Sequence, residues 1–315
     1  MTSRTYTLWS VALTLSMVSA IGAFNWIVDP YDYFGNNRLG VYISAEREAK
    51  PDMLRHYPHD ALLVGNSKAA MIPAGQLTGR RFFNGAFGGA SVEEMYHFVN
   101  HFATTQNLVL ASVDLGHFSQ GKPAGDLFAP RSIQDKLDKL SSLKSVEYSW
   151  RTIASHLAGE SPHMSADGSF IARRWFELYD RENPDELRYT LQTLKGWFDR
   201  YDRAPGTGMD YYRMMARVLK ERRIACAVFI PPLHEELARH LRASTNYAKI
   251  LQWKRELDAI FPLVLDYSIG PYSRAQNFFK ADPVHFKPEV GAALINGEVM
   301  PEIPPPGGGE PGGRR

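Results

Sequence analysis

Cysteine is almost absent from this sequence: its 315 residues include one, Cys226. A disulfide within the chain is therefore excluded, and the burial of apolar side chains has to stabilise the fold. Because Cys226 lies in the apolar stretch IACAVFI, we expect it to be a small side chain of the core.

An excess of charge of either sign is also lacking. The 36 lysines and arginines nearly balance the 34 aspartates and glutamates, and the formal net charge is +2. Basic residues do not gather into one stripe, so the sequence gives no electrostatic reason to expect a nucleic-acid partner. Hydrophobic residues make up 44% of the chain and charged residues 22%, which is the balance of a folded globular protein.

Charged residues are missing altogether from residues 5–28. This apolar stretch is long enough to cross a bilayer core of ~30 Å at ~1.5 Å per residue. Trp9 and Trp26 lie near its two ends, where aromatic rings favour the membrane interface. We therefore expect residues 1–28 to form an amino-terminal membrane anchor or a signal segment.

The residues that flank this stretch bear on its orientation. Arg4 precedes it, and Asp29 and Asp32 follow it, which favours an inside amino terminus and an exported main domain, periplasmic or extracellular. The alternative is a signal peptide cleaved at the small residues that end at Ala20, which would leave a secreted domain. We expect a retained anchor because the stretch has the length of a full membrane span.

The carboxyl terminus lacks the side chains of a packed element. It ends in PPPGGGEPGGRR, in which the prolines lack backbone donors and the glycines lose much entropy on ordering. We expect residues 301–315 to be a disordered tail, which leaves residues 29–300 for the main domain.

Between these ends, apolar runs of strand length alternate with helical patterns. The runs comprise residues 61–64, 81–83, 108–115, 224–230 and 263–265. Runs that are apolar throughout are typical of a parallel sheet covered on both faces. The helical stretch SVEEMYHFVNHF begins with Ser91 and Glu94 at the spacing of a capping box. The predicted fold class is α/β, a three-layer sandwich with a mainly parallel sheet.

The interval at about residues 121–207 interrupts this alternation. It is largely polar or helical in pattern and contains no strong strand. We expect a helical insertion that forms a cap over the carboxyl edge of the sheet.

Three loops at the predicted strand ends carry polar residues, and ligands gather at this edge of an open parallel sheet. The first is Gly-Asn-Ser at residues 65–67, and the second is NGAFGGAS, which begins at Asn84. The third is ADPVHFKP, in which Asp282 and His285 are three residues apart.

At that spacing a carboxylate can bond one imidazole nitrogen and leave the other free to accept a proton. A serine hydroxyl is a weak nucleophile until such a base removes its proton. Because the first and last loops of a parallel sheet can meet above the strand ends, Ser67, His285 and Asp282 are candidates for a catalytic triad.

With these motifs in this order, the chain resembles the SGNH (GDSL-like) hydrolase superfamily. Within that superfamily it is most similar to exported or membrane-anchored acyltransferases that modify polysaccharides and cell-wall polymers. The matching blocks are Gly65-Asn66-Ser67, then Asn84 with Gly89, and finally Asp282-Pro283-Val284-His285. The likeness spans residues 28–300, and no motif supports it within the insertion. It implies an SGNH/flavodoxin-like sheet.

The resemblance implies a role for each matching residue. Ser67 would be the nucleophile, His285 the general base and acid, and Asp282 the residue that orients the histidine. The backbone amides of Ser67 and Gly89 would form the oxyanion hole, and each such donor is typically worth about 3–4 kcal/mol. Superfamily members usually add an asparagine after the third strand, whereas this chain has VDLGHFSQG there, with His117 in place of an amide.

Several other polar residues belong to the predicted strand ends or follow them. The candidate pocket residues are Asn66, Asn84, His117 and His234. Lys68, directly after the serine, is expected to be a solvated side chain; the alternative is that it favours the oxyanion electrostatically. Asp114 ends the third strand and is expected to anchor its loop.

His97 and His101 have the helical i, i+4 spacing that a metal site would need. No acidic third ligand is evident in the sequence, and the helix that carries them is amphipathic. We therefore expect neither a metal nor a cofactor.

Together these features predict a serine-dependent acyl-ester transferase or esterase at the exported face. The preferred reaction is O-acetylation of a polysaccharide or cell-envelope glycan through an acyl-serine intermediate. The expected partners are an acyl donor, a glycan acceptor, the membrane through the amino-terminal helix, and a multi-pass acyl-carrying membrane protein.

Two alternatives of other classes stay open. A catalytically silent protein with the same fold would bind a glycan or assemble with an acetylation or export complex, and the missing asparagine favours it. A membrane-tethered scaffold would have no pocket at the strand ends.

Overall fold

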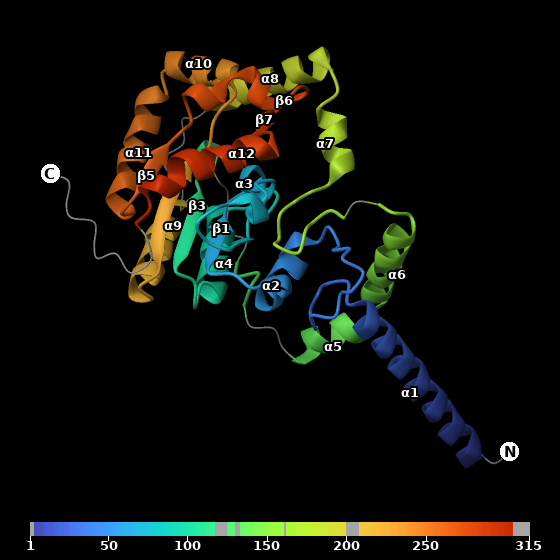
Figure 1. Ribbon diagram of the computed structural model, residues 1–315. Coiled ribbons are helices and arrows are strands. Elements are labelled where there is room, and N and C mark those ends of the chain that lie inside the picture. Colours follow the sequence, from blue (N-terminus) through green and yellow to red (C-terminus); the bar gives the residue numbers. More distant parts are fainter. Residues whose placement is uncertain (1–2, 117–124, 130–132, 161, 200–207, 305–315) are drawn as a thin grey trace.

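The structure is a computed structural model, shown in Figure 1. It describes residues 3–116, 125–129, 133–160, 162–199 and 208–304. Within these ranges a body of mixed helices and strands carries one long amino-terminal helix that projects away from it.

Five parallel strands form the central sheet of this body, in the order β2-β1-β3-β4-β5. They are β1 (Ala61–Val64), β2 (Phe82–Asn84), β3 (Leu108–Ser112), β4 (Ala225–Ile230) and β5 (Val264–Asp266). All five predicted strands are present, with ends shifted by at most three residues, and the α/β class with a mostly parallel sheet is confirmed.

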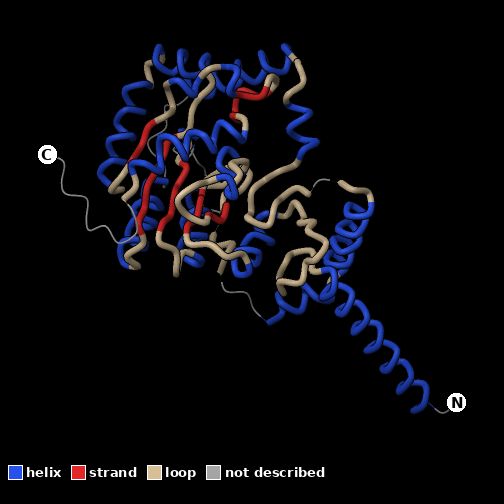
Figure 2. The backbone as a smooth tube through the Cα atoms, in the orientation of Figure 1, coloured by secondary structure: helices blue, strands red, loops and turns tan. Residues whose placement is uncertain are grey.

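Helices cover both faces of this sheet (Figure 2). Alternate strand residues point to opposite sides, so Leu62 belongs to one apolar cluster and Leu63 to the other. The first cluster is covered by α2 (Glu46–His56), α4 (Val92–Phe102), α9 (Gly208–Glu221), α10 (Glu235–Ala243) and α11 (Tyr247–Ile260). The second is covered by α3 (Ser67–Ala70) and α12 (Pro288–Leu294).

Helix α4 illustrates how local sequence sets these elements. Ser91 accepts a hydrogen bond from the Glu94 amide, and the Glu94 side chain accepts one from the Ser91 amide. The predicted capping box is therefore present and defines where the helix begins.

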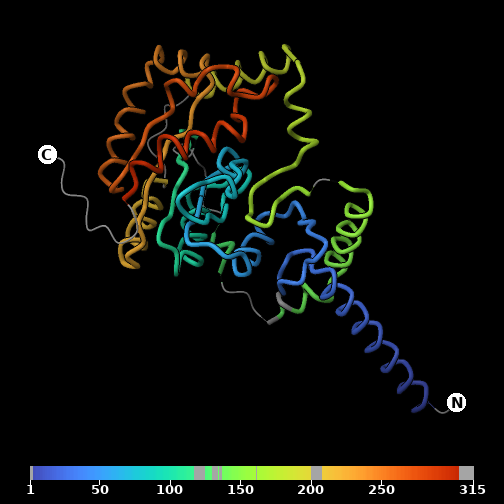
Figure 3. Tube along the Cα trace, in the orientation of Figure 1, coloured from blue at the N-terminus to red at the C-terminus, as the bar shows by residue number. Residues whose placement is uncertain are grey.

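The amino-terminal helix α1 (Ser3–Val28) is largely exposed along its length (Figure 3). Among the described residues it is the one helix long and apolar enough to cross a membrane, a property that a signal sequence shares. Asn25, near its carboxyl end, is buried: its amide donates to the Leu140 carbonyl at 2.7 Å and its oxygen accepts from Ser149 Oγ at 2.8 Å. These bonds fix the base of α1 to the body.

The predicted insertion contains four described helices with two different surroundings. They are α5 (Ile133–Ser141), α6 (Leu143–Leu157), α7 (Arg173–Tyr179) and α8 (Pro184–Asp199). Helices α5 and α6 pack against α1, whereas α8 packs against β7 and α10. The expectation of one cap over the sheet edge was wrong for α5 and α6, because polar and apolar contacts hold them at the base of α1 instead.

The carboxyl-terminal region also departs from prediction. A short antiparallel hairpin, β6 (Phe278–Phe279) and β7 (Asp282–Phe286), occupies a stretch that the sequence predicted as a loop. The domain also extends past residue 300, because Met300–Glu302 form a short helical turn and Ile303 is buried. The rest of the predicted tail, residues 305–315, lies outside the described residues. The remaining short turns are Ala74–Gln76, Pro271–Ser273, Ala275–Asn277 and Ile295–Val299.

The packing of α12 can be tested at Gly291. A Cβ atom there would lie 2.7 Å from Ile72 Cγ1 and from Phe286 Cε2. We expect Gly291→Ala to lower the free energy of unfolding by about 1–3 kcal/mol through overpacking, as measured by denaturant titration followed by circular dichroism.

Gly196→Ala in α8 is the matched control, because nothing lies within 4 Å of its added Cβ. The higher helix propensity of alanine should leave that variant as stable as the parent or more stable by up to ~1 kcal/mol. Equal unfolding midpoints for the two variants would contradict the close packing of α12.

Candidate active site

Ser67 lies at the carboxyl end of β1, as the first residue of α3. Asn66 caps this short helix by accepting a hydrogen bond from the Lys68 amide at 3.1 Å. A glycine is required at position 65 because a larger residue would clash: an added Cβ would lie 2.8 Å from the Cβ atoms of both Ala69 and Ser112. The tight turn thus presents Ser67 between β1 and β3, where the strand order reverses and ligands of open parallel sheets bind.

His285 and Asp282 reach the same place from β7. Ser67 Oγ lies 2.9 Å from His285 Nε2, and His285 Nδ1 lies 2.5 Å from Asp282 Oδ2. The structure therefore brings the three predicted triad residues into one hydrogen-bonded chain. In this geometry the carboxylate accepts from one ring nitrogen, and the other nitrogen can accept the serine proton.

Two further contacts hold the imidazole in place. Asp282 is 5% exposed, and its second oxygen, Oδ1, accepts a hydrogen bond from the Val284 amide at 2.8 Å. The ring of Trp175 meets the ring of His285 edge-on, with centroids 5.3 Å apart. Sequence patterns gave no sign of Trp175, because its helix lies in the insertion and no periodicity shows which of its faces meets the histidine.

A cavity of about 330 Å³ opens beside Ser67, within the size range of small-ligand sites. Helix α8 supplies one wall through Leu194, Trp197 and Phe198. The remaining lining residues are Asn66, Ser67, Lys68, Asp114, Gly116, Thr193, Leu233, Leu237, Pro283 and Val284. The hydroxyl of Ser67 thus borders a space with mainly apolar walls and few charged groups.

Those charged groups are Lys68 and Asp114, whose Nζ and Oδ2 atoms lie 2.5 Å apart. The expectation that Lys68 is solvated was wrong: its side chain is 6% exposed. Asp114 also accepts a hydrogen bond from the Gly116 amide at 2.6 Å, so it anchors the loop after β3 as expected. Lys68, like Ser67 at the start of α3, faces the cavity.

Asn84 has a different place from the predicted one. It is fully buried, and its amide nitrogen donates to the carbonyls of Ala69 at 2.8 Å and Ile72 at 2.9 Å. Its oxygen accepts from the Ala86 amide at 3.0 Å. The prediction of a pocket residue was therefore wrong, since the amide nitrogen of this side chain braces the backbone that follows Ser67 and its oxygen braces its own loop after β2.

The other predicted pocket residues have separate outcomes. Asn66 lines the cavity, and His117 lies outside the described residues. His234 is buried at the start of α10, where it accepts a hydrogen bond from the Glu236 amide at 3.3 Å, and it does not line the cavity. Burial lowers the pKa of His234, so the neutral, capping form is favoured.

Gly89, predicted as an oxyanion donor, lies in an exposed turn after β2 with φ +63°. The neighbouring Phe87 amide donates to the Gly65 carbonyl at 3.1 Å, which keeps this loop beside the Ser67 turn. Gly89 is not among the described residues that line the cavity.

Comparisons of the chain with models of protein families, with curated proteins and with solved structures find no match. Functional inference for this protein therefore depends on the geometry of the site.

The ion pair in the cavity wall gives a test of the site. Lys68→Met would leave the Asp114 carboxylate buried without its cation, and we expect a loss of roughly 3 kcal/mol in the free energy of unfolding. Lys280→Met is the control, since Lys280 pairs with Glu182 at 3.5 Å on the surface, and such pairs are worth at most ~1 kcal/mol. Chemical denaturation measures both variants, and equal losses would refute a buried pair at Lys68.

Proposed function

We propose that this protein is a serine-dependent acyl-ester transferase or esterase that acts at the exported face of a membrane. The observation that carries this proposal is the hydrogen-bonded chain Ser67–His285–Asp282 at the mouth of a small cavity. A serine, a base within hydrogen-bond reach and a carboxylate that orients the base are the parts of nucleophilic acyl transfer.

The reaction follows from these positions. As Ser67 Oγ attacks the ester carbonyl carbon, His285 Nε2 takes the serine proton, and Asp282 stabilises the resulting imidazolium. His285 then returns the proton to the departing alcohol oxygen, which leaves an acyl group on Ser67. A second hydroxyl, from an acceptor or from water, attacks that ester while His285 accepts its proton, and Ser67 is restored.

Membership of the SGNH superfamily, with a flavodoxin-like sheet, is part of the proposal. The order of the three sequence blocks supports it, and so does the strand order 2-1-3-4-5, which is that of flavodoxin-like sheets. The backbone amide of Ser67 would donate to the oxyanion, whereas Gly89, in an exposed turn outside the cavity, keeps no such role in the proposal. Where superfamily members carry an asparagine, this chain has Asp114 paired with Lys68, so we assign the third donor to the Lys68 ammonium group.

A second cavity is the candidate acceptor site. It measures about 450 Å³ and is lined in part by Glu160, Arg173, Arg174 and Trp175. Because Trp175 lines this cavity and its ring also contacts His285, the cavity adjoins the catalytic base. Charged and aromatic groups suit a carbohydrate, which favours O-acetylation of a polysaccharide or envelope glycan. The acyl donor would be a small ester or an acyl-carrying multi-pass membrane protein.

The alternative is a catalytically silent protein that binds a glycan or joins an acetylation or export complex. The specific observation in its favour is that the loop after β3 carries Asp114, which accepts hydrogen bonds and donates none. Such a protein would keep both cavities but show no reactive serine.

The proposal predicts that Ser67→Ala and His285→Ala each reduce turnover of a chromogenic acetyl ester by about 10³-fold or more, because each removes a partner of the proton transfer. A fluorophosphonate probe should label the parent chain and leave Ser67→Ala unlabelled. Ser141→Ala, in α5 and in the wall of neither cavity, should keep full turnover and labelling.

Circular dichroism spectra matching the parent would show that both variants fold. Undiminished turnover in either one would remove the triad assignment. A parent chain that neither turns over esters nor reacts with the probe would favour the silent alternative.

A further inference from the structure

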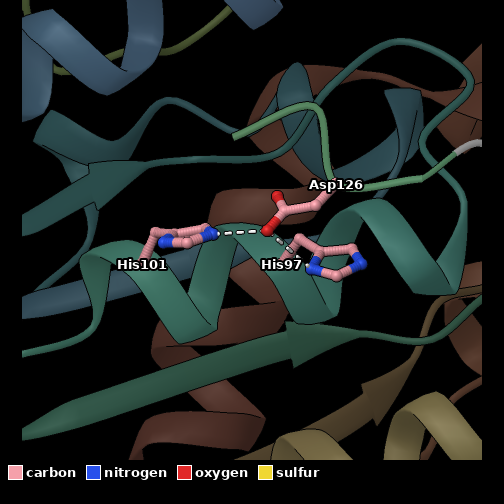
Figure 4. Close-up of side chains that lie close together, drawn as sticks. All are labelled: His97, His101 and Asp126. Carbon is pink, nitrogen blue, oxygen red and sulfur yellow. Dashed lines mark hydrogen bonds and ion pairs between the residues drawn. The ribbon is translucent and has the colours of Figure 1, made fainter. Parts of the chain in front are cut away.

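His97 and His101 face a carboxylate that the sequence did not reveal. Both histidines lie on α4, and Asp126, from a segment 25 residues beyond His101, reaches over them (Figure 4). Asp126 Oδ2 lies 2.7 Å from His101 Nε2 and 3.3 Å from His97 Nδ1. The expectation of no metal rested on the lack of an acidic third ligand, and Asp126 is such a ligand.

The spacing of these atoms suits one small cation. The three ligand atoms all lie within 4.8 Å of one another. Around a tetrahedral Zn²⁺, with bonds of ~2.0–2.2 Å to nitrogen and carboxylate oxygen, ligand atoms are ~3.3 Å apart. The distance from Asp126 to His97 already has this value, and the shorter distance from Asp126 to His101 would lengthen by a small rotation of a side chain.

The surroundings of His97 also fit a metal ligand. Its Nδ1 atom is buried and makes no hydrogen bond within the described part of the chain, yet it is directed at the Asp126 carboxylate. Its other nitrogen, Nε2, faces Glu93 Oε1 at 3.9 Å. A carboxylate behind a ligating imidazole fixes its orientation and raises its basicity, as in many metal sites.

We propose that His97, His101 and Asp126 bind one Zn²⁺-like divalent cation, with water at the fourth position. The site would be structural. His101 lies at the end of α4 that leads to the amino end of β3, on the edge of the sheet opposite the Ser67 cavity. Phe128, two residues after Asp126, packs against Phe98 and Phe102 with ring centroids 5.5 and 6.1 Å apart, so the metal would fasten this segment to α4.

The test measures zinc binding to the full chain in detergent, with a chromophoric chelator as competitor after EDTA treatment. We expect one equivalent of Zn²⁺ at pH 7.5 and weaker binding at pH 5.5, because protons compete with the metal for the ligating nitrogens. At a free zinc concentration about 100 times Kd, the unfolding midpoint should rise by roughly 5 °C.

His101→Ala and Asp126→Asn should each abolish this binding. The matched control is His240→Ala on α10, which removes a similar exposed pair, His240 Nε2 with Asp199 Oδ1 at 2.8 Å, and should bind zinc like the parent. Loss of binding in the first two variants with unchanged circular dichroism would support the site. No stoichiometric binding by the parent, or binding retained in both variants, would overturn it.

A second inference comes from α6, which buries small polar side chains and exposes large apolar ones. Its buried face carries the small polar residues Ser145, Ser149 and Thr152, each at most 1% exposed. Leu143, Trp150 and Leu157 recur every seven residues on the opposite face and are 84%, 61% and 79% exposed. The exposed charged residues Lys144, Glu147 and Arg151 border this apolar row. A helix in contact with water on its outer side normally buries its large apolar residues.

The position of α6 indicates what covers this face. Helices α6 and α1 are packed together, and the Trp150 ring lies 5.4 Å from that of Phe24, in the last turns of α1. Trp26 and Ile27 of α1 are exposed there as well. Helix α6 lies beside the end of α1 that meets the body (Figure 1). Its exposed apolar residues are therefore next to those of the candidate membrane helix.

We infer that α6 lies on the lipid surface with Leu143, Trp150 and Leu157 in the interface, as amphipathic interfacial helices do. This inference rests on retention of α1 as an anchor, which is part of the proposed function. It gives the exported domain a fixed orientation on the membrane instead of a free tether.

The test places one cysteine at Leu143 or at Leu157 in a Cys226→Ala chain and labels it with an environment-sensitive fluorophore. The labelled protein is reconstituted in phosphatidylcholine–phosphatidylglycerol vesicles that contain doxyl lipid. We expect a blue shift and quenching at both positions, but neither at Tyr189→Cys on α8, which is 71% exposed and away from α1.

Flotation of the same samples reports the anchor separately. Protein that floats with the vesicles while both α6 probes stay in water would overturn the inference and leave the anchor intact. Protein that fails to float would contradict the anchor, and with it this inference.

Discussion

The hydrogen bond between Ser67 Oγ and His285 Nε2 joins residues 218 positions apart, and the rest of the site depends on it. One hydrogen bond contributes only about 0.5–1.5 kcal/mol, far less than the entropy lost in ordering the chain between its ends. The bond exists because packing has already brought α3 and β7 together. Gly65 lets the serine turn approach β3, and Asn84 braces the backbone that leaves it.

The cavity wall also holds a buried ion pair between Lys68 and Asp114. Burying Lys68 and Asp114 costs desolvation that their attraction offsets only in part, so a buried pair is weak evidence of a stabilising role. Its position in the wall of an otherwise mainly apolar cavity is better explained by a task in the site. An ammonium group held beside a nucleophile can stabilise negative charge as it develops, which is the role we assign to Lys68.

The insertion contacts two separate regions of the fold, the candidate site and the base of α1. Its second half supplies the wall of the cavity and the Trp175 ring beside His285. Its first half joins the base of α1 through Asn25 and Ser149 and turns an apolar face outward. The described parts of the insertion thus contact both the base of α1 and the candidate site.

Local patterns in the sequence were enough to predict the five strands, the capping box of α4 and the apolar helix at the amino terminus. Each of these depends on residues close together in the chain, through strand-length apolar runs, cap spacing and hydrophobic length. The same patterns wrongly predicted a solvated Lys68 and an Asn84 in the pocket. Only the packed chain shows which side of a turn faces a cavity. Contacts between distant segments, such as Asp126 with His101 or α6 with α1, were decided by tertiary packing, which brings together side chains that share no local pattern.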